Sequence, residues 1–363
     1  MKLRLALIAM LSLSPVARAD EGGGARAPEA PPAPARAARP PRAPAAPAGP
    51  SWGEGGEGGE ATRTDTTVSV PSRARLELEN FGGGIIVAAW DRNAVRVQAQ
   101  HQRGTSVGCE VGPAAVVLRA NRLLRVPDPS SRRGARLQAI PFPAQVDYRL
   151  TVPRWMSLRL SGVNTQIMVA GVEGDISAES ITGSVAVRGG RGNIKVGTVT
   201  GGVEVIGARG SVEASSVNEG VILRDVEGPV RAESVTGDVD LEQIVSDAVE
   251  ASTVSGDLRY SGTLRPDGSY QLESHSGDLT VILPAHPDVA VSVSTYSGEF
   301  ASSFPVQSKS TFTSVKGRGK EFDFTLGDGR AELTLESFSG FIRLVRAGET
   351  AGHVSVVHIH RDK

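Results

Sequence analysis

The sequence contains very little cysteine and few aromatic residues. Its 363 residues include one Cys, three Trp, four Tyr and nine Phe. The single cysteine, Cys109, excludes an internal disulfide framework and every metal motif built from several cysteines. The core must therefore rest on aliphatic burial and backbone pairing, and the 43 glycines indicate many tight turns.

The chain also lacks an excess of charge of either sign. Its 40 acidic residues nearly balance 39 Lys and Arg, so no global basic field favours a nucleic-acid partner, and we expect none. The charge is uneven along the chain. Residues 61–160 contain 15 Arg against 7 acidic residues, whereas residues 163–298 contain 8 basic and 19 acidic residues. A basic end beside an acidic body could favour end-to-end self-association.

No apolar run is long enough to span a membrane as a helix. The longest, Leu5 to Leu13, follows Lys2 and Arg4 and precedes Ala17-Arg18-Ala19. This order is typical of a secretory signal peptide. We therefore predict a signal peptide over residues 1–19, export to the periplasm or the cell surface, and no transmembrane segment in the mature chain. Residues 20–60 are rich in Pro, Ala and Gly and cannot bury a core, which predicts a disordered linker.

From residue 163 onward the sequence repeats. Triplets such as Ile181-Thr182-Gly183 and Val199-Thr200-Gly201 recur every 18 residues, and the later spacings lengthen to 19 and 21. Between the turns lie short segments with apolar residues at alternate positions, for example Val203 and Val205, and no segment has a sustained helical period. The pattern predicts an all-β fold, a parallel β-solenoid of roughly 18–21-residue coils.

The repeat also predicts the domain boundaries. We expect N-terminal strands and a cap over residues 61–162, solenoid coils over 163–346 and a C-terminal tail over 347–363. The strands between Thr66 and Gln100 and the segment from Phe322 to Val345 are the expected caps. The interval of 42 residues before Phe338-Ser339-Gly340 equals either two coils or one coil with an insertion.

Two stretches outside the regular coils resemble a known family. The sequence RLELENFGGGIIVAAWD at Arg75–Asp91 and LTLESFSGFI at Leu333–Ile342 are similar to parts of the DUF4097 adhesin-like domain. The serial Val-Thr-Gly-Asp-Val coils between them resemble it too. The resemblance implies a β-strand-repeat envelope protein, and it supplies no catalytic residues.

Stacked coils would align equivalent side chains into columns. The position after the turn glycine brings Asp238, Asp257, Asp278 and Glu299 into an acidic ladder, either solvated turn residues or contacts for a cation or a sugar. Serines and threonines three residues before each triplet's glycine, such as Ser180 and Thr198, form a second column, which we expect to satisfy backbone groups of the turns. We predict no catalytic residues, no cofactor and no other metal site. Cys109 and the tail histidines His353, His358 and His360 are weaker candidates for a reactive thiol and a metal clamp.

These features favour a non-catalytic, exported envelope protein, a solenoid scaffold for a cell-envelope polysaccharide or a protein partner. An accessory sensor in envelope-stress signalling is one alternative. A carbohydrate-active β-helix enzyme is another, but the coils between residues 163 and 260 contain no Trp and a single Tyr, Tyr260, on which a sugar could stack.

Overall fold

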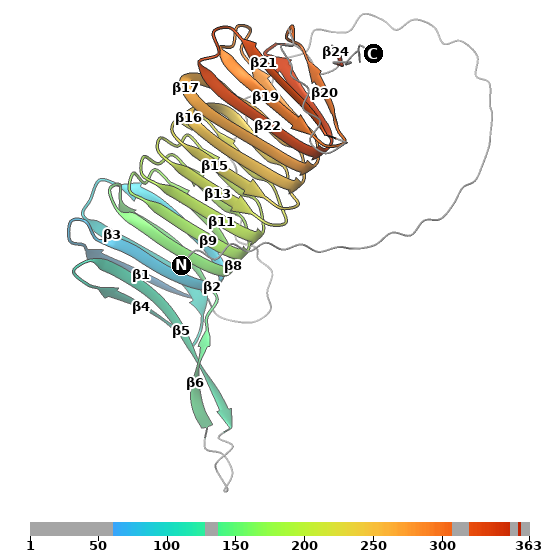
Figure 1. Cartoon of the computed structure of the whole chain (residues 1–363). Coiled ribbons are helices and arrows are strands. Elements are labelled where there is room, and N and C mark those ends of the chain that lie inside the picture. Colours follow the sequence, from blue (N-terminus) through green and yellow to red (C-terminus); the bar gives the residue numbers. More distant parts are fainter. Residues whose placement is uncertain (1–60, 128–136, 307–318, 349–354, 357–363) are drawn as a thin grey trace, which may run out of the picture. The chain divides into compact units, whose positions relative to one another are not determined.

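A computed structural model describes residues 61–127, 137–306, 319–348 and 355–356. The predicted signal peptide, the linker and the tail histidines lie outside these residues. The described part contains 24 strands and no helix, so no described helix could cross a membrane. The predicted all-β parallel solenoid is confirmed (Figure 1). The strands are β1 (Ala61–Ser69), β2 (Arg75–Trp90), β3 (Ala94–Gln102), β4 (Thr105–Val111), β5 (Ala115–Pro127), β6 (Leu137–Pro143), β7 (Val146–Pro153), β8 (Ser157–Ala170), β9 (Ile176–Thr182), β10 (Val185–Arg188), β11 (Ile194–Thr200), β12 (Val203–Ile206), β13 (Val212–Ser216), β14 (Val221–Arg224), β15 (Val230–Ser234), β16 (Val239–Ser255), β17 (Leu258–Ser276), β18 (Leu279–Leu283), β19 (Val289–Thr295), β20 (Glu299–Ser302), β21 (Lys320–Leu326), β22 (Ala331–Ser339), β23 (Phe341–Arg346) and β24 (Ser355–Val356).

Each regular coil contributes one strand to each of two faces. On the first face, β9, β11, β13 and β15 pair in parallel, with partners 18 residues apart. On the second face, β10, β12 and β14 pair in the same way. The long strands β8, β16 and β17 run through the corner and contribute to both faces. Residues at equivalent positions of the repeat therefore stand directly above one another, about one strand spacing of 4.8 Å apart.

The core is a column of aliphatic side chains inside the coils. In the coil that starts at β11, Ile194, Val196, Val203 and Val205 point inward and are at most 1% exposed. The return from the second face to the first adds Ala208, which is completely buried. Because each inward residue packs on the same position of the next coil, the core continues without interruption from one coil to the next.

The C-terminal end inverts the order of the coils. Strands β22 and β23 pair with β17 and β18 on one side and with β19 and β20 on the other. Strands β19 and β20 therefore do not pair with β17 and β18, which precede them in sequence. Strands β22 and β23, which come later in the chain, lie between the two pairs. The 42-residue interval contributes β20 to one face and β22 to the other, with β21 between them in sequence, so it is one coil with an insertion. This coil runs back, so that Phe338-Ser339-Gly340 lies between two coils that precede it in sequence. Of the expected cap Phe322–Val345, only β21 covers the end, pairing antiparallel with β19.

The N-terminal end has a similar arrangement. Strand β2 lies between β8 on one side and β5 and β7 on the other, all in parallel. Strand β3 pairs antiparallel with β7, and β1 pairs antiparallel with β3. The parallel stack therefore starts before residue 163, and β2, which we had assigned to the cap, is one of its levels.

Candidate functional site

The buried hydroxyls of the second column donate hydrogen bonds to backbone carbonyl groups of the turns, as the sequence predicts. Thr198 Oγ1 donates to the carbonyl oxygen of Gly183 at 3.0 Å, and Ser216 Oγ donates to that of Gly201 at 3.1 Å. The same contact recurs at 2.7 Å from Ser180 to Thr165. These hydroxyls are buried and bond along the stack, so they hold neighbouring turns together and are not exposed nucleophiles. The donors of this column are Ser180, Thr198, Ser216, Ser234, Thr253 and Ser274.

The acidic ladder also has a structural task. Asp238 Oδ1 accepts the backbone N–H of Asp257 at 2.8 Å, and Asp257 Oδ1 accepts that of Asp278 at 2.9 Å. Asp278 Oδ1 accepts the N–H of Phe341 at 3.0 Å, because the inverted coil brings β23 to this level. Glu299 consequently lies one level beyond Phe341 and is not adjacent to Asp278. In the described part of the chain, no group of three His, Cys, Asp or Glu side chains is arranged to hold a metal ion.

A substitution at Asp257 separates the hydrogen bond from the charge. We expect Asp257→Asn to keep the free energy of unfolding within about 0.5 kcal/mol of wild type, since an amide oxygen also accepts the Asp278 N–H. Asp257→Ala removes the acceptor and should cost about 1 kcal/mol. Denaturant unfolding of both variants measures this difference. A large loss in the Asn variant would instead show that the negative charge is needed, as it would be for a bound cation.

Asp278 makes the stability sensitive to acid. Partial burial alone would raise the pKa of its carboxyl, but the Phe341 N–H and the Arg343 guanidinium, 2.7 Å away, hold that pKa below its ordinary value. A carboxyl with a depressed pKa contributes stability above its unfolded pKa of about 3.9, and this contribution is lost as the pH falls through the folded value. We therefore expect unfolding free energies measured between pH 5 and pH 2 to fall more steeply for wild type than for Asp278→Asn. Parallel curves would contradict this assignment.

An exposed apolar column, which the sequence analysis did not identify as a surface, runs along the edge where the first face ends. It consists of the first residue of each triplet and its equivalents, each 38% to 52% exposed. The strand register places these residues on successive levels, from β2 through β8, β9 and β11 to β17, β22 and β19. We call this column the apolar ladder: Phe81, Val163, Ile181, Val199, Val217, Val235, Val254, Phe338 and Tyr296, with His275 between Val254 and Phe338.

Aromatic rings form one end of the apolar ladder. The Phe338 ring stacks on His275 with centroids 4.7 Å apart and on Tyr296 with centroids 4.8 Å apart, and the interplanar angles are 13° and 6°. These distances match the spacing of the levels. Both faces of the Phe338 ring are therefore covered, whereas His275 and Tyr296 each have one face stacked on Phe338.

Two hollows lie beside the apolar ladder. The larger, about 620 Å³, is lined by Ile181, Val199 and Lys195. It extends over Gly197, which has no side chain, and over the small side chain of Ser215, and both leave room next to the ladder. The smaller, about 260 Å³, lies at the aromatic end. The column that contains Gly197 and Ser215 also carries carboxylates, which we call the acidic rim: Glu79, Glu179, Glu233, Glu273 and Glu336.

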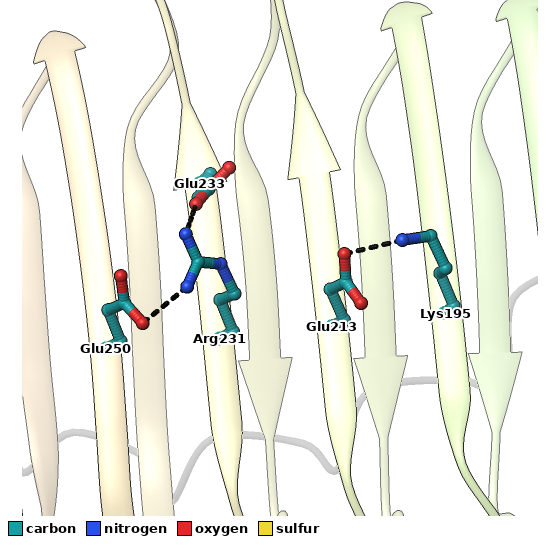
Figure 2. Close-up of polar contacts among 5 residues, drawn as sticks. All are labelled: Lys195, Glu213, Arg231, Glu233 and Glu250. Carbon is teal, nitrogen blue, oxygen red and sulfur yellow. Dashed lines mark hydrogen bonds and ion pairs between the residues drawn. The ribbon is translucent and has the colours of Figure 1, made fainter. Parts of the chain in front are cut away.

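A further column of the first face lies two residues before the acidic rim in each strand and contains Lys195, Glu213, Arg231 and Glu250. Ion pairs largely neutralise the charges of this column. Lys195 Nζ lies 2.6 Å from Glu213, and Arg231 lies 2.5 Å from Glu250 (Figure 2). Arg231 also contacts Glu233 of the acidic rim at 2.5 Å. For the other four members of the rim, no ion pair or side-chain hydrogen bond is found among the described residues. Lys195, which also lines the larger hollow, interacts electrostatically with Glu179 and Glu233, so the negative charge of the rim is least compensated at Glu79, Glu273 and Glu336.

Cys109, the candidate for a reactive thiol, has a role in packing. Cys109 is a free, partly buried cysteine on β4 that packs against the core. Burial raises the pKa of its thiol, which lowers the fraction of reactive thiolate at neutral pH.

Comparisons with known proteins give a match to one family model. The family model for Toastrack DUF4097 matches residues 152–344. A candidate cell adhesion protein from Clostridium sporogenes is 13% identical with a TM-score of 0.20, and the alignment covers 79% of this chain and 100% of that one. A candidate adhesin from Bacteroides fragilis is 11% identical with a TM-score of 0.38, covering 79% and 97%. No curated protein matches the chain. None of these likenesses specifies what this chain binds.

Proposed function

The chain belongs to the Toastrack DUF4097 family, and from that premise we propose that it is a non-catalytic, exported envelope protein whose coil stack is an adhesin-like binding scaffold. The apolar ladder is the observation that carries this proposal. Its side chains are not needed for the core, because the inward aliphatics already fill the interior. Nine large apolar side chains left exposed in a single line are typical of a surface that another molecule covers.

The partner in this proposal is a cell-envelope polymer or a protein. The ladder repeats at each level, so an extended partner lying along the stack would meet an equivalent contact at every level. The hollow beside Ile181 and Val199 adds depth at one place along it. The proposal that the protein is exported rests on the signal-peptide pattern of residues 1–19.

The chemistry of the columns supports a scaffold without catalysis. The carboxylates of Asp238, Asp257 and Asp278 accept backbone N–H groups, and the buried hydroxyls donate to carbonyl oxygens. Both sets of groups are therefore used in holding the coils together. The exposed apolar ladder and the acidic rim are not used in this way, so they remain as the surface to which a partner could bind.

A pull-down tests the proposal. The purified protein is incubated with isolated envelope polysaccharide and with peptidoglycan, with and without calcium, and the same tubes are assayed for released oligosaccharide. We expect retention of at least one material without release. Release of oligosaccharide would overturn the proposal in favour of a carbohydrate-active enzyme. A failure to retain any envelope material would favour the signalling alternative, and calcium-dependent retention would point to the acidic ladder as a ligand site.

A further inference from the structure

The spacing of the apolar ladder limits the conformation of a polypeptide that could follow it. Successive levels are about 4.8 Å apart, so two levels span about 9.6 Å. A polyproline II helix has three residues per turn and rises about 3.1 Å per residue, so one turn spans about 9.3 Å. Every third residue of such a helix would therefore meet every second level of the ladder, and the mismatch over several turns remains small.

The charges beside the apolar ladder limit the amino-acid composition of such a polypeptide. Along the acidic rim, Glu79 and Glu179 are two levels apart, Glu179 and Glu233 three, Glu233 and Glu273 two, and Glu273 and Glu336 one. On the other side of the ladder the neighbouring positions are uncharged, as at Thr200 and Asn218, whose side chains bond to each other. On this side, Asp238, Asp257 and Asp278 lie three residues beyond the ladder and accept backbone N–H groups. A partner would thus gain from cationic groups along the acidic rim.

We propose that the apolar ladder binds an extended, proline-rich polypeptide that carries several basic residues along one side. Proline and alanine would contact the ladder and the 620 Å³ hollow, while the basic side chains would reach the acidic rim. A second copy of the same surface fits less well, because its own acidic rim would face carboxylates.

The probe is a synthetic peptide of this chemistry. Residues 31–50 of the sequence itself provide one, since Arg36, Arg39 and Arg42 as well as Pro41, Pro44 and Pro47 follow each other at three-residue intervals. A labelled peptide of these residues is titrated with the purified protein, and binding is followed by fluorescence anisotropy. Peptides with Glu in place of Arg, and with Gly in place of Pro, are the controls. We expect saturable binding of the first peptide and at least about tenfold weaker binding of both controls.

Variants locate the binding surface. Ile181→Asp together with Val199→Asp should weaken peptide binding by at least about tenfold, and Val111→Asp, at an exposed valine on β4 away from the ladder, should not change it. Glu79→Gln with Glu179→Gln should weaken binding a few-fold and reduce its dependence on salt, whereas Glu204→Gln on the second face should have no effect. Equal melting temperatures show that each variant is folded.

This inference depends on the proposed function, and the two can fail separately. If the protein retains envelope material but does not bind the Pro/Arg peptide, or binds the Glu peptide equally well, the inference is wrong and the scaffold stands. If the ladder variants bind the peptide like wild type, the binding surface lies elsewhere and the inference is also wrong. If the peptide binds at the ladder and no envelope material is retained, the envelope ligand of the proposed function is wrong while the inference holds.

Discussion

Val203→Asp is expected to abolish cooperative folding of the coil stack. Val203 is 1% exposed and packs between Val185 and Val221 of the adjacent coils. A carboxylate there has no partner to compensate its desolvation, and it interrupts a core in which each coil depends on its neighbours. The expected loss is about 4 kcal/mol or more. Circular dichroism and denaturant unfolding measure it.

Val199→Asp is the matched control for this prediction. It makes the same substitution four residues away, on the apolar ladder, where the valine is 43% exposed. The free energy of unfolding should stay within about 0.5 kcal/mol of wild type. If Val199→Asp were as damaging as Val203→Asp, the ladder would belong to the core and could not be a free surface.

Gly201→Ala is expected to have the second largest effect. Gly201 has a φ of 145°, and a Cβ at this position would lie 2.5 Å from the carbonyl oxygen of Gly183 in the preceding coil. Because that atom belongs to the backbone, the two coils would have to separate locally, which would also break the Thr198 hydrogen bond to Gly183. We expect a loss of about 3 kcal/mol, measured by denaturant unfolding.

Gly207→Ala separates backbone conformation from crowding. Gly207 has a φ of 71°, and no atom lies within 4 Å of an added Cβ. The variant should therefore lose only the conformational cost of a left-handed alanine, about 1 kcal/mol. Similar losses at both glycines would mean that close approach of the coils is not what requires Gly201.

The regular coils could be predicted from the sequence because their interactions are periodic. The 18-residue spacing fixes which residues stack, and the inward aliphatics and buried hydroxyls follow from it. The ladder itself was missed because a valine at each triplet looks like a core residue. Alternation from Ile194 through Thr198 places Val199 on the outer face, and this parity is the signal that could have identified it.

The ends of the stack could not be predicted in this way. Sequence spacing implies that consecutive coils are neighbours, but β22 and β23 insert between coils that were formed earlier in the chain. That order depends on which apolar surfaces fit together over more than 60 residues of separation. The same non-local pairing places Phe341 between Asp278 and Glu299, so the four carboxylates of the predicted ladder are not all adjacent.

The most direct test of the account compares retention of envelope material by three proteins. These are wild type, the ladder variant Ile181→Asp/Val199→Asp/Val217→Asp and the control Val111→Asp, each first shown to melt like wild type. We predict that wild type and the control retain the material, that the ladder variant does not, and that none of them releases oligosaccharide. Retention by the ladder variant equal to that of wild type, or release of oligosaccharide by any of the three, would contradict a non-catalytic scaffold that binds through its apolar ladder.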